Sequence, residues 1–188
     1  MIDVSLTFVR QVLDQYLVTS FGQESGIVIL NNLINSDGQV PEKNKNKIVI
    51  TLVNLEYETN KQYYGGKKLE GEQYSLVNPA VYFNLDILIS ASFDEYSESL
   101  KVLTAIIGFF QENQAFNRAN SPMLPDGISM LKFEIENSSS AKMQNLWTSL
   151  GAKYLPSIIY KIRHVAVQGG QIKGSSVAIQ NVSGSAAP

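Results

Sequence analysis

The feature that most constrains the fold is a period-two pattern of apolar residues at positions 81–90. The alternate apolar positions are Val81, Phe83, Leu85, Ile87 and Ile89. Because successive side chains of a strand point to opposite faces, this spacing predicts a β-strand. The period then changes, and the next apolar residues fall at helical spacing, at Leu100, Leu103, Ile106, Ile107 and Phe110. A strand followed by an amphipathic helix predicts helices packed on a sheet.

The remaining patterns predict two more helices and four more strands. Helices are expected at residues 2–20 and from 138–140 to 150, and strands at 27–30, 48–53, 131–136 and 157–168. Asp94 or Ser97 is the expected N-cap of the helix that carries Leu100. The order of elements predicts an α+β fold, in which a mixed β-sheet carries about three helices packed on it.

The length of 188 residues corresponds to one domain, or to one domain with a tail. We expect the domain at residues 1–168, with residues 57–78 as an inserted loop, because this stretch is polar and holds three glycines. Residues 169–188 are predicted to be a flexible Gly/Ser-rich C-terminal tail, in which Lys173 is the only charged residue. The tail contains one candidate strand at 177–182.

Composition excludes several classes of function. The chain has no cysteine and one histidine, which excludes thiol catalysis, disulfides, cysteine-based zinc sites and iron–sulfur clusters. We expect no cofactor. Fifteen basic and 17 acidic residues give a net charge of −2, so the sequence predicts neither nucleic-acid binding nor attraction to an anionic membrane. The longest strongly apolar stretch, at 102–110, is shorter than the ~20 residues of a membrane helix, so no membrane insertion is expected.

The residues that could carry catalysis favour structural interpretations. His164 alternates with Ile162 and other apolar residues, which predicts a structural histidine on the same strand face as those residues. Glu134 and Glu136 are two residues apart, which places both carboxylates on one strand face, and we interpret that face as solvated. The sequence Gly-Gly-Lys-Lys at 65–68 lacks the first glycine and the hydroxyl residue of a phosphate-binding loop. None of these residue patterns predicts a catalytic site.

Three segments are candidates for contacts with other proteins. The inserted loop carries two tyrosines and two lysines that suit a projecting contact, at Tyr63, Tyr64, Lys67 and Lys68. Trp147 has two interpretations, as a core residue or as an interface anchor. Val177 and Ile179 lie in the candidate strand of the tail, which could add to an open sheet edge of another subunit.

Several motifs resemble the cap, or tail-terminator, proteins of phage-tail-like contractile injection systems. They are NPAVYFNL at 78–85, YSESLKVL at 96–103 and LWTSLGAKYLPS at 146–157, and the last is the most specific. The similarity covers residues 2–167. The tyrosine-rich insertion and the tail are individual to this chain, so the resemblance implies no role for them.

The resemblance implies a structural cap that is not an enzyme and that closes the distal end of the inner tube and contractile sheath as a six-fold ring. Its partners would then be further copies of itself, the inner tube protein and the sheath protein. The implied place of assembly is the bacterial cytoplasm, within a particle that is afterwards released or membrane-anchored. Two alternatives stay open: a small-molecule or nucleotide-handling enzyme on an α+β fold, and an adaptor or chaperone that assists assembly without staying in the particle.

Overall fold

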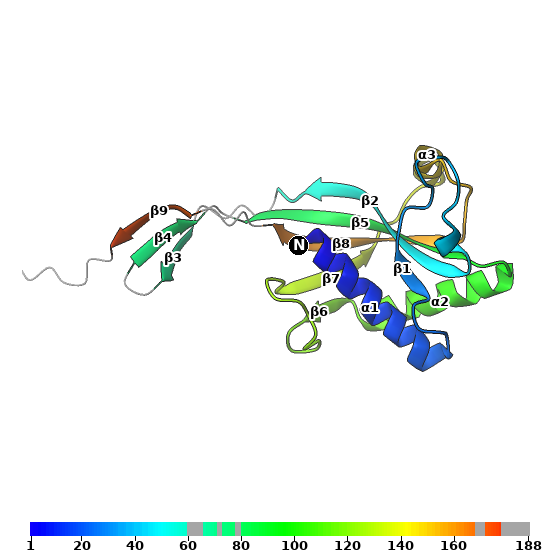
Figure 1. The fold of residues 1–188 in the computed structure, drawn as a ribbon, viewed down its shortest axis with the longest axis horizontal. Helices are drawn as coiled ribbons and strands as arrows, with labels where there is room; N and C mark the ends of the chain where they lie inside the picture. Colours follow the sequence, from blue (N-terminus) through cyan, green and yellow to red (C-terminus); the bar gives the residue numbers. More distant parts are fainter. Residues whose placement is uncertain (60–65, 71–72, 78–79, 168–171, 178–188) are drawn as a thin grey trace, which may run out of the picture.

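The computed structural model describes residues 1–59, 66–70, 73–77, 80–167 and 172–177. In chain order the elements are α1 (Ile2–Phe21), β1 (Val28–Leu30), a 3₁₀ turn η1 (Glu42–Asn44), β2 (Lys47–Tyr57), β3 (Gly66–Glu70), β4 (Gln73–Val77), β5 (Val81–Ser92), α2 (Tyr96–Glu112), β6 (Ala115–Asn117), β7 (Met130–Ile135), α3 (Ser140–Leu150), β8 (Ser157–Val167) and β9 (Ile172–Val177). Figure 1 shows one main sheet with helices on both of its faces and a smaller sheet apart from it.

The main sheet has six strands in the order β1-β2-β5-β8-β7-β6. Strand β1 runs parallel to β2, whereas the four other neighbouring pairs are antiparallel, so the sheet is mixed. The prediction of an α+β fold with a mixed sheet and three helices is confirmed. None of the described helices combines the length and the apolar composition needed to cross a lipid bilayer.

One face of the sheet, here called the α1/α2 face, carries the larger core. Leu85, Ile87 and Ile89 of β5 are fully buried there beneath the two long helices. Aromatic rings join the layers: Phe110 of α2 lies 4.5 Å from Tyr160 of β8, and Phe8 of α1 lies 5.4 Å from Phe116 of β6, between ring centroids. Each such buried side chain contributes roughly 1.5–3 kcal/mol through its removal from water.

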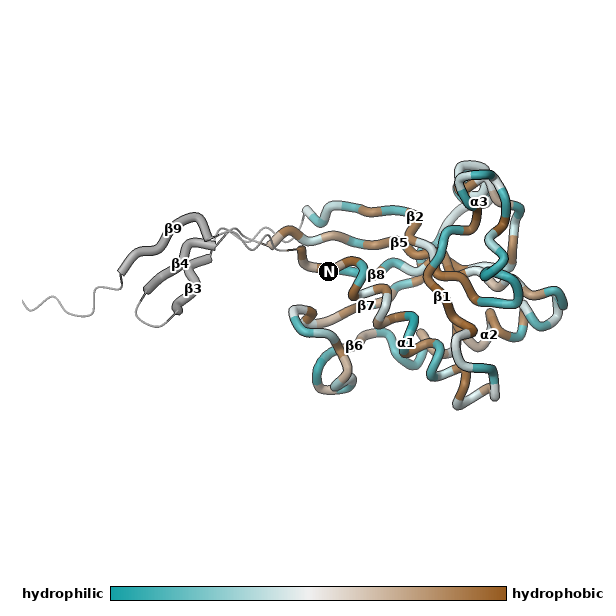
Figure 2. Tube along the Cα trace, in the orientation of Figure 1, coloured by the Kyte–Doolittle hydropathy of each residue, from teal (hydrophilic) through white to brown (hydrophobic). Residues whose placement is uncertain are grey.

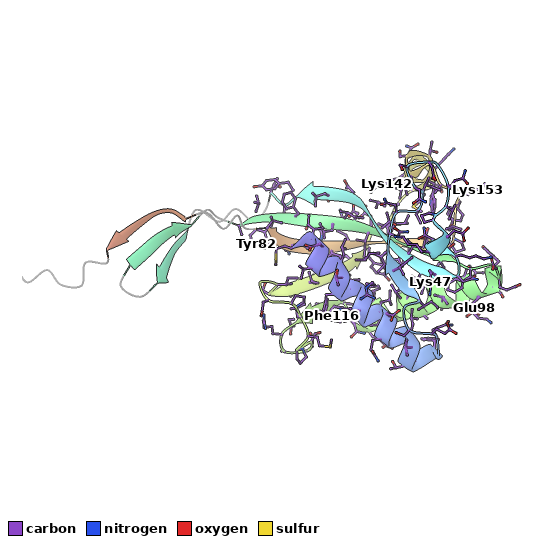
Figure 3. All side chains as sticks on the ribbon, viewed as in Figure 1. Lys47, Tyr82, Glu98, Phe116, Lys142 and Lys153 are labelled. Carbon is purple, nitrogen blue, oxygen red and sulfur yellow. The ribbon has the colours of Figure 1, made fainter. Side chains whose placement is uncertain are left out.

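The opposite face, here called the α3 face, carries a second core. Trp147 of α3 packs with Leu88 of β5 and Ile159 of β8, and all three are buried. Figure 3 shows the two sides of the sheet, with Lys142 on α3 and Phe116 beside α1. Residues 84–91 of β5 are buried without interruption, and Leu88 breaks the simple alternation of the sequence because it lies beneath α3 on this face.

The helix ends follow the sequence signals in α3 but not in α2. Ser139 caps α3 by accepting a hydrogen bond from the Lys142 amide, and Gly151 ends it in the left-handed conformation that suits glycine. The N-cap of α2 is Glu95, without a side-chain bond, rather than Asp94 or Ser97. Asp94 instead pairs with Asn46: its amide donates to Asn46 Oδ1, and its carboxylate accepts from Asn46 Nδ2.

The described parts of the predicted insertion and tail form a three-stranded antiparallel sheet in the order β3-β4-β9, here called the arm. The arm stands away from the main sheet at the end where β2, β5 and β8 meet it (Figure 1). Strand β9 ends at Val177, so the candidate strand at 177–182 otherwise lies outside the described residues. No apolar alternation marks Ile172–Val177, and the strand is defined by its backbone pairing with β4.

Replacement of Trp147 by alanine should lower the free energy of unfolding by ~3–5 kcal/mol, because the indole fills the core of the α3 face. Urea denaturation followed by circular dichroism measures this change. The matched control is Ser149→Ala, an exposed position on the same helix, which should change stability little. A Trp147→Ala variant as stable as the control would contradict a core role.

Candidate functional site

On the α3 face of the main sheet, the area that helix α3 does not cover is covered by charged side chains. Lys161 of β8 lies at the centre, and its side chain is only 11% exposed. Its Nζ is 2.8 Å from Glu56 Oε2 and 3.6 Å from both Asp86 Oδ1 and Glu136 Oε2. Three carboxylates from three different segments therefore surround one ammonium group.

The ion pairs stabilise the charged forms of these residues. The hydrogen bond to Glu56 raises the pKa of Lys161, against the opposing effect of burial. The hydrogen bond from Lys142 of α3, at 2.7 Å, lowers the pKa of Glu136. Glu136 thus connects α3 to the central lysine, and the network fixes the helix beside the sheet.

Glu134 and Glu136 do not work as a pair, because each contacts different cations. Glu134 Oε1 accepts from Lys132 at 2.9 Å, and its Oε2 accepts from Arg163 at 2.8 Å. These hydrogen bonds lower the pKa of Glu134, and the bond from Lys132 has the larger effect. A general acid needs a raised pKa, so the geometry disfavours acid–base chemistry at either carboxylate.

His164 does not lie where the sequence alternation predicts, because a β-bulge interrupts β8. Phe83 pairs with Val165 while Leu85 pairs with Ile162, so β8 has one more residue than β5 between these pairs. His164 occupies the bulge with φ of +60°. Val165 therefore joins Ile162 in the core, and the prediction that His164 shares that face is wrong.

The bulge histidine is held by side chains of its neighbours. Its backbone amide donates to Asn84 Oδ1 at 3.1 Å, and its Nε2 lies 3.5 Å from Glu58 Oε2. Asn84 Nδ2 donates to the same Glu58 oxygen at 3.0 Å, and Glu58 and Asn84 are both buried. These contacts support a structural role for His164.

The structure separates the predicted interface residues. Trp147 is buried under α3, and its ring contacts the exposed Tyr154 at 5.5 Å, beside a groove of about 570 Å³. Lys67 and Lys68 lie in β3, and Val177 ends β9, so the arm brings these two strands to opposite sides of β4. Tyr63, Tyr64 and Ile179 lie outside the described residues. Within the described part of the chain, no group of acidic or histidine side chains is arranged to hold a metal ion.

The sequence patterns do not anticipate an exposed apolar edge on β2. Strand β1 pairs only with residues 48–50, so no described strand lies on the outer side of β2 along residues 52–57. Leu52, Leu55 and Tyr57 are 37%, 45% and 52% exposed on this half of the strand. The signal is present in the sequence, because alternation continues from residue 53 to Tyr57, but the expected strand ends at residue 53.

A second bulge, in β2, determines which side chains of this edge lie on each face of the sheet. Leu52 pairs with Ile87 while Asn54 pairs with Asp86, so β2 carries an extra residue between them. Leu55 consequently pairs with Leu85 on the α1/α2 face, whereas Asn54 Nδ2 donates to Asp86 Oδ2 on the α3 face. Figure 2 shows apolar residues along β5 up to the end beside the arm, where Val81 is 40% exposed. The edge is thus apolar on one face and polar on the other.

Comparison with known proteins shows one matching family and solved structures with a similar fold. The family described as the Pvc16 N-terminal domain matches residues 6–180. The sheath/tube terminator of the extracellular contractile injection system PVC, in its extended state, superposes with a TM-score of 0.63 at 16% identity over 96% of this chain and 62% of that chain. The tube-terminating cap of the anti-feeding prophage superposes with a TM-score of 0.60 at 13% identity over 95% of this chain and 60% of that chain. No curated protein sequence matches.

Replacing Glu136 by glutamine should lower stability by up to about 1 kcal/mol at neutral pH, because its ion pairs with Lys142 and Lys161 are partly exposed. Its pKa is lowered in the folded state, so the contribution is complete above the unfolded pKa and is lost as the pH falls through the folded pKa. Chemical denaturation between pH 7 and pH 3 should therefore show wild type and variant converging in acid. Glu24→Gln, at an exposed position, is the control. A difference that stays constant with pH would argue against the ion pair.

The bulge predicts a contrast between two substitutions of His164. Asparagine tolerates the left-handed conformation, whereas a β-branched residue does not. His164→Val should therefore be less stable than His164→Asn by ~1–2 kcal/mol, since both lose the contact with Glu58 but only valine is strained. Paired urea denaturation curves measure the difference. Equal stability of the two variants would show that the strand relaxes around the bulge.

Proposed function

The chain belongs to the Pvc16 N-terminal domain family, and we propose that it is a structural cap that closes the distal end of the inner tube and contractile sheath of an injection system. In this proposal the cap is a six-fold ring. Its partners are further copies of itself, the inner tube protein and the sheath protein, and it assembles in the bacterial cytoplasm.

The observation that carries the proposal is the coverage of the two superpositions. Nearly the whole of this chain aligns with a sheath/tube terminator and with a tube-terminating cap. At 16% and 13% identity these likenesses concern the fold, and this chain spans about three fifths of the length of either protein. Function and partners are therefore inferred from the shared fold together with the family.

The physics of tube growth supports a terminator. A tube of stacked identical rings is a heterologous assembly, which grows without limit unless its last face is covered. A terminator needs surfaces that pair with that face, and the open, partly apolar edge of β2 is a surface of this kind. The charged residues of the α3 face are instead engaged with one another, as expected where they hold the fold rather than transform a substrate.

Deletion of the gene should give particles of irregular length, or free tubes and sheaths, because growth then lacks its terminator. Negative-stain electron microscopy of purified particles measures the length distribution. Expression of the wild-type chain from a plasmid should restore uniform length and serves as the control. Particles of normal length and yield without the protein would exclude the cap.

Composition of the purified particles separates the cap from an assembly adaptor. A cap stays in the mature particle at a fixed ratio to the tube protein, whereas an adaptor is present during assembly and absent afterwards. Quantitative mass spectrometry of particles purified at high salt measures that ratio. Complete loss of the protein from intact particles would favour the adaptor.

A further inference from the structure

Both edges of the main sheet are only partly covered. Strand β1 covers β2 at residues 48–50 and leaves residues 52–57 without a described neighbour. Strand β6 covers β7 at residues 130–132, and no described strand lies on the outer side of β6. The sheet therefore has the open half of β2 at one edge and the short strand β6 at the opposite edge (Figure 1).

These two open strands lie at the same level of the sheet. Leu55 and Phe133 belong to one row of paired residues that crosses the sheet from β2 to β7. One residue further toward the arm lie Glu56 in β2 and Lys132 in β7, and Lys132 pairs with Ala115 of β6. A second copy placed beside the first, with its helices on the same side, therefore brings its β6 next to the open half of β2 without a shift along the strands.

The outer side of β6 already binds an amide group, which comes from a side chain. Asn120 Nδ2 donates to the carbonyl oxygen of Ala115 at 2.7 Å, and Asn120 Oδ1 accepts from the backbone amide of Asn117 at 2.8 Å. A residue of a parallel neighbouring strand makes the same two bonds with its own C=O and N–H. The side chain of Asn120 thus occupies the position of a strand residue that is paired with Phe116.

Tyr57 of a second copy has the groups that this position requires. The amide of Glu58 donates inward to Tyr82 of β5, and the direction of such bonds alternates along a strand, so the N–H and C=O of Tyr57 point outward. Its side chain lies with Phe83 on the α1/α2 face, and Phe116 belongs to the same face. Tyr57 is 52% exposed, so the contact would bury an aromatic ring beside Phe116.

The other face of this contact is complementary in charge. Glu56 lies on the α3 face, where its side chain is 42% exposed. The neighbouring positions of the second copy on that face are Ala115 and, beside it, Lys132, whose side chain is 50% exposed. Because alanine is short, the carboxylate of Glu56 and the ammonium group of Lys132 can approach each other across it.

We propose that the open half of β2 in one copy of this chain pairs in parallel with β6 of a neighbouring copy, where Tyr57 displaces the side chain of Asn120 and the main sheet continues across the subunit boundary. The contact joins two different surfaces, which is the heterologous type of contact that builds rings. The proposal rests on the self-association that the proposed cap requires. It assigns to Asn120 the role of covering the β6 edge in a copy that has no neighbour.

Cysteine cross-linking tests the pairing directly, because the chain has no cysteine. Glu56→Cys is mixed with Ala115→Cys and oxidised, and the two positions should form a disulfide because they lie side by side on one face. Leu55→Cys, on the other face of the same strand, should not cross-link to Ala115→Cys. Neither Glu56→Cys nor Ala115→Cys should form a disulfide-linked dimer by itself, because the contact joins two different surfaces.

Two outcomes overturn the proposal: no cross-link of position 56 to position 115 above the background, or equal cross-linking of positions 55 and 56 to position 115. Tyr154→Cys, which is 66% exposed and lies outside both strands, is mixed with Ala115→Cys to measure the background of random collisions.

Substitution of Asn120 tests its covering role in chains without cysteine. Asn120→Ala removes the amide that competes for the β6 edge, so self-association measured by sedimentation velocity should become about tenfold tighter. The backbone amide of Asn120 still donates to Asn117 Oδ1, which keeps the turn. The control is Ser121→Ala, which leaves the amide in place and should not change association. Unchanged or weaker association of Asn120→Ala contradicts the covering role.

A change of charge tests the contact on the α3 face. Lys132→Gln should weaken self-association about fivefold, because the attraction to Glu56 of the neighbouring copy is lost. Lys153→Gln makes the same change at an exposed loop position and should leave association unchanged. Equal behaviour of the two variants contradicts the contact.

Failure of this inference and failure of the cap role give different results. Purified chains that self-associate without the face-specific cross-links overturn the strand pairing and leave the cap role standing. Face-specific cross-links in a chain whose deletion does not affect particles would leave the pairing standing and exclude the cap.

Discussion

The fold depends on the pairing of β5 with both of its neighbours. Ten residue pairs join β5 to β2 and nine join it to β8, and residues 84–91 are buried on both faces. Residues of β5 belong to both hydrophobic cores and to the ion-pair network around Lys161. The packing on both faces of the sheet therefore depends on this strand. Ile87 and Leu88 are adjacent in this strand and point to opposite faces, so the first belongs to the α1/α2 core and the second to the α3 core.

Two β-bulges, one in β2 and one in β8, determine on which face of the sheet the side chains of these strands lie. Because the side-chain period of a strand is two, one extra residue moves every following side chain to the other face. The extra residue of β2 lies between Leu52 and Asn54, and that of β8 lies between Ile162 and Val165. Each bulge lies at a different level of β5. With both in place, Leu55, Phe83 and Val165 lie on one face of the sheet, whereas Glu56 and Lys161 lie on the other.

Sequence patterns are sufficient where burial determines the structure and insufficient where backbone pairing does. The alternation at 81–90 and the helical spacing from Leu100 predict β5 and α2, because each buries an apolar face. The alternation places His164 on the wrong face, since a bulge leaves no mark in a run of alternating residues. The strands β3 and β4 of the arm have no such signal, because their pairing comes from main-chain groups that every residue has. The interface residues in the insertion and tail stay predictions.

The edge of β2 that no described strand covers also affects the behaviour of the isolated chain. An exposed strand with a row of apolar side chains can pair with other chains without regard to identity, and such pairing leads to aggregation. Charged residues along an edge discourage wrong partners, and Glu56 stands between Leu55 and Tyr57 in this position. Neutralising Glu56 therefore removes a barrier to misassembly as well as an ion pair. In the proposed cap role, copies made in excess of the other particle components would keep this edge uncovered and would be the ones prone to aggregate.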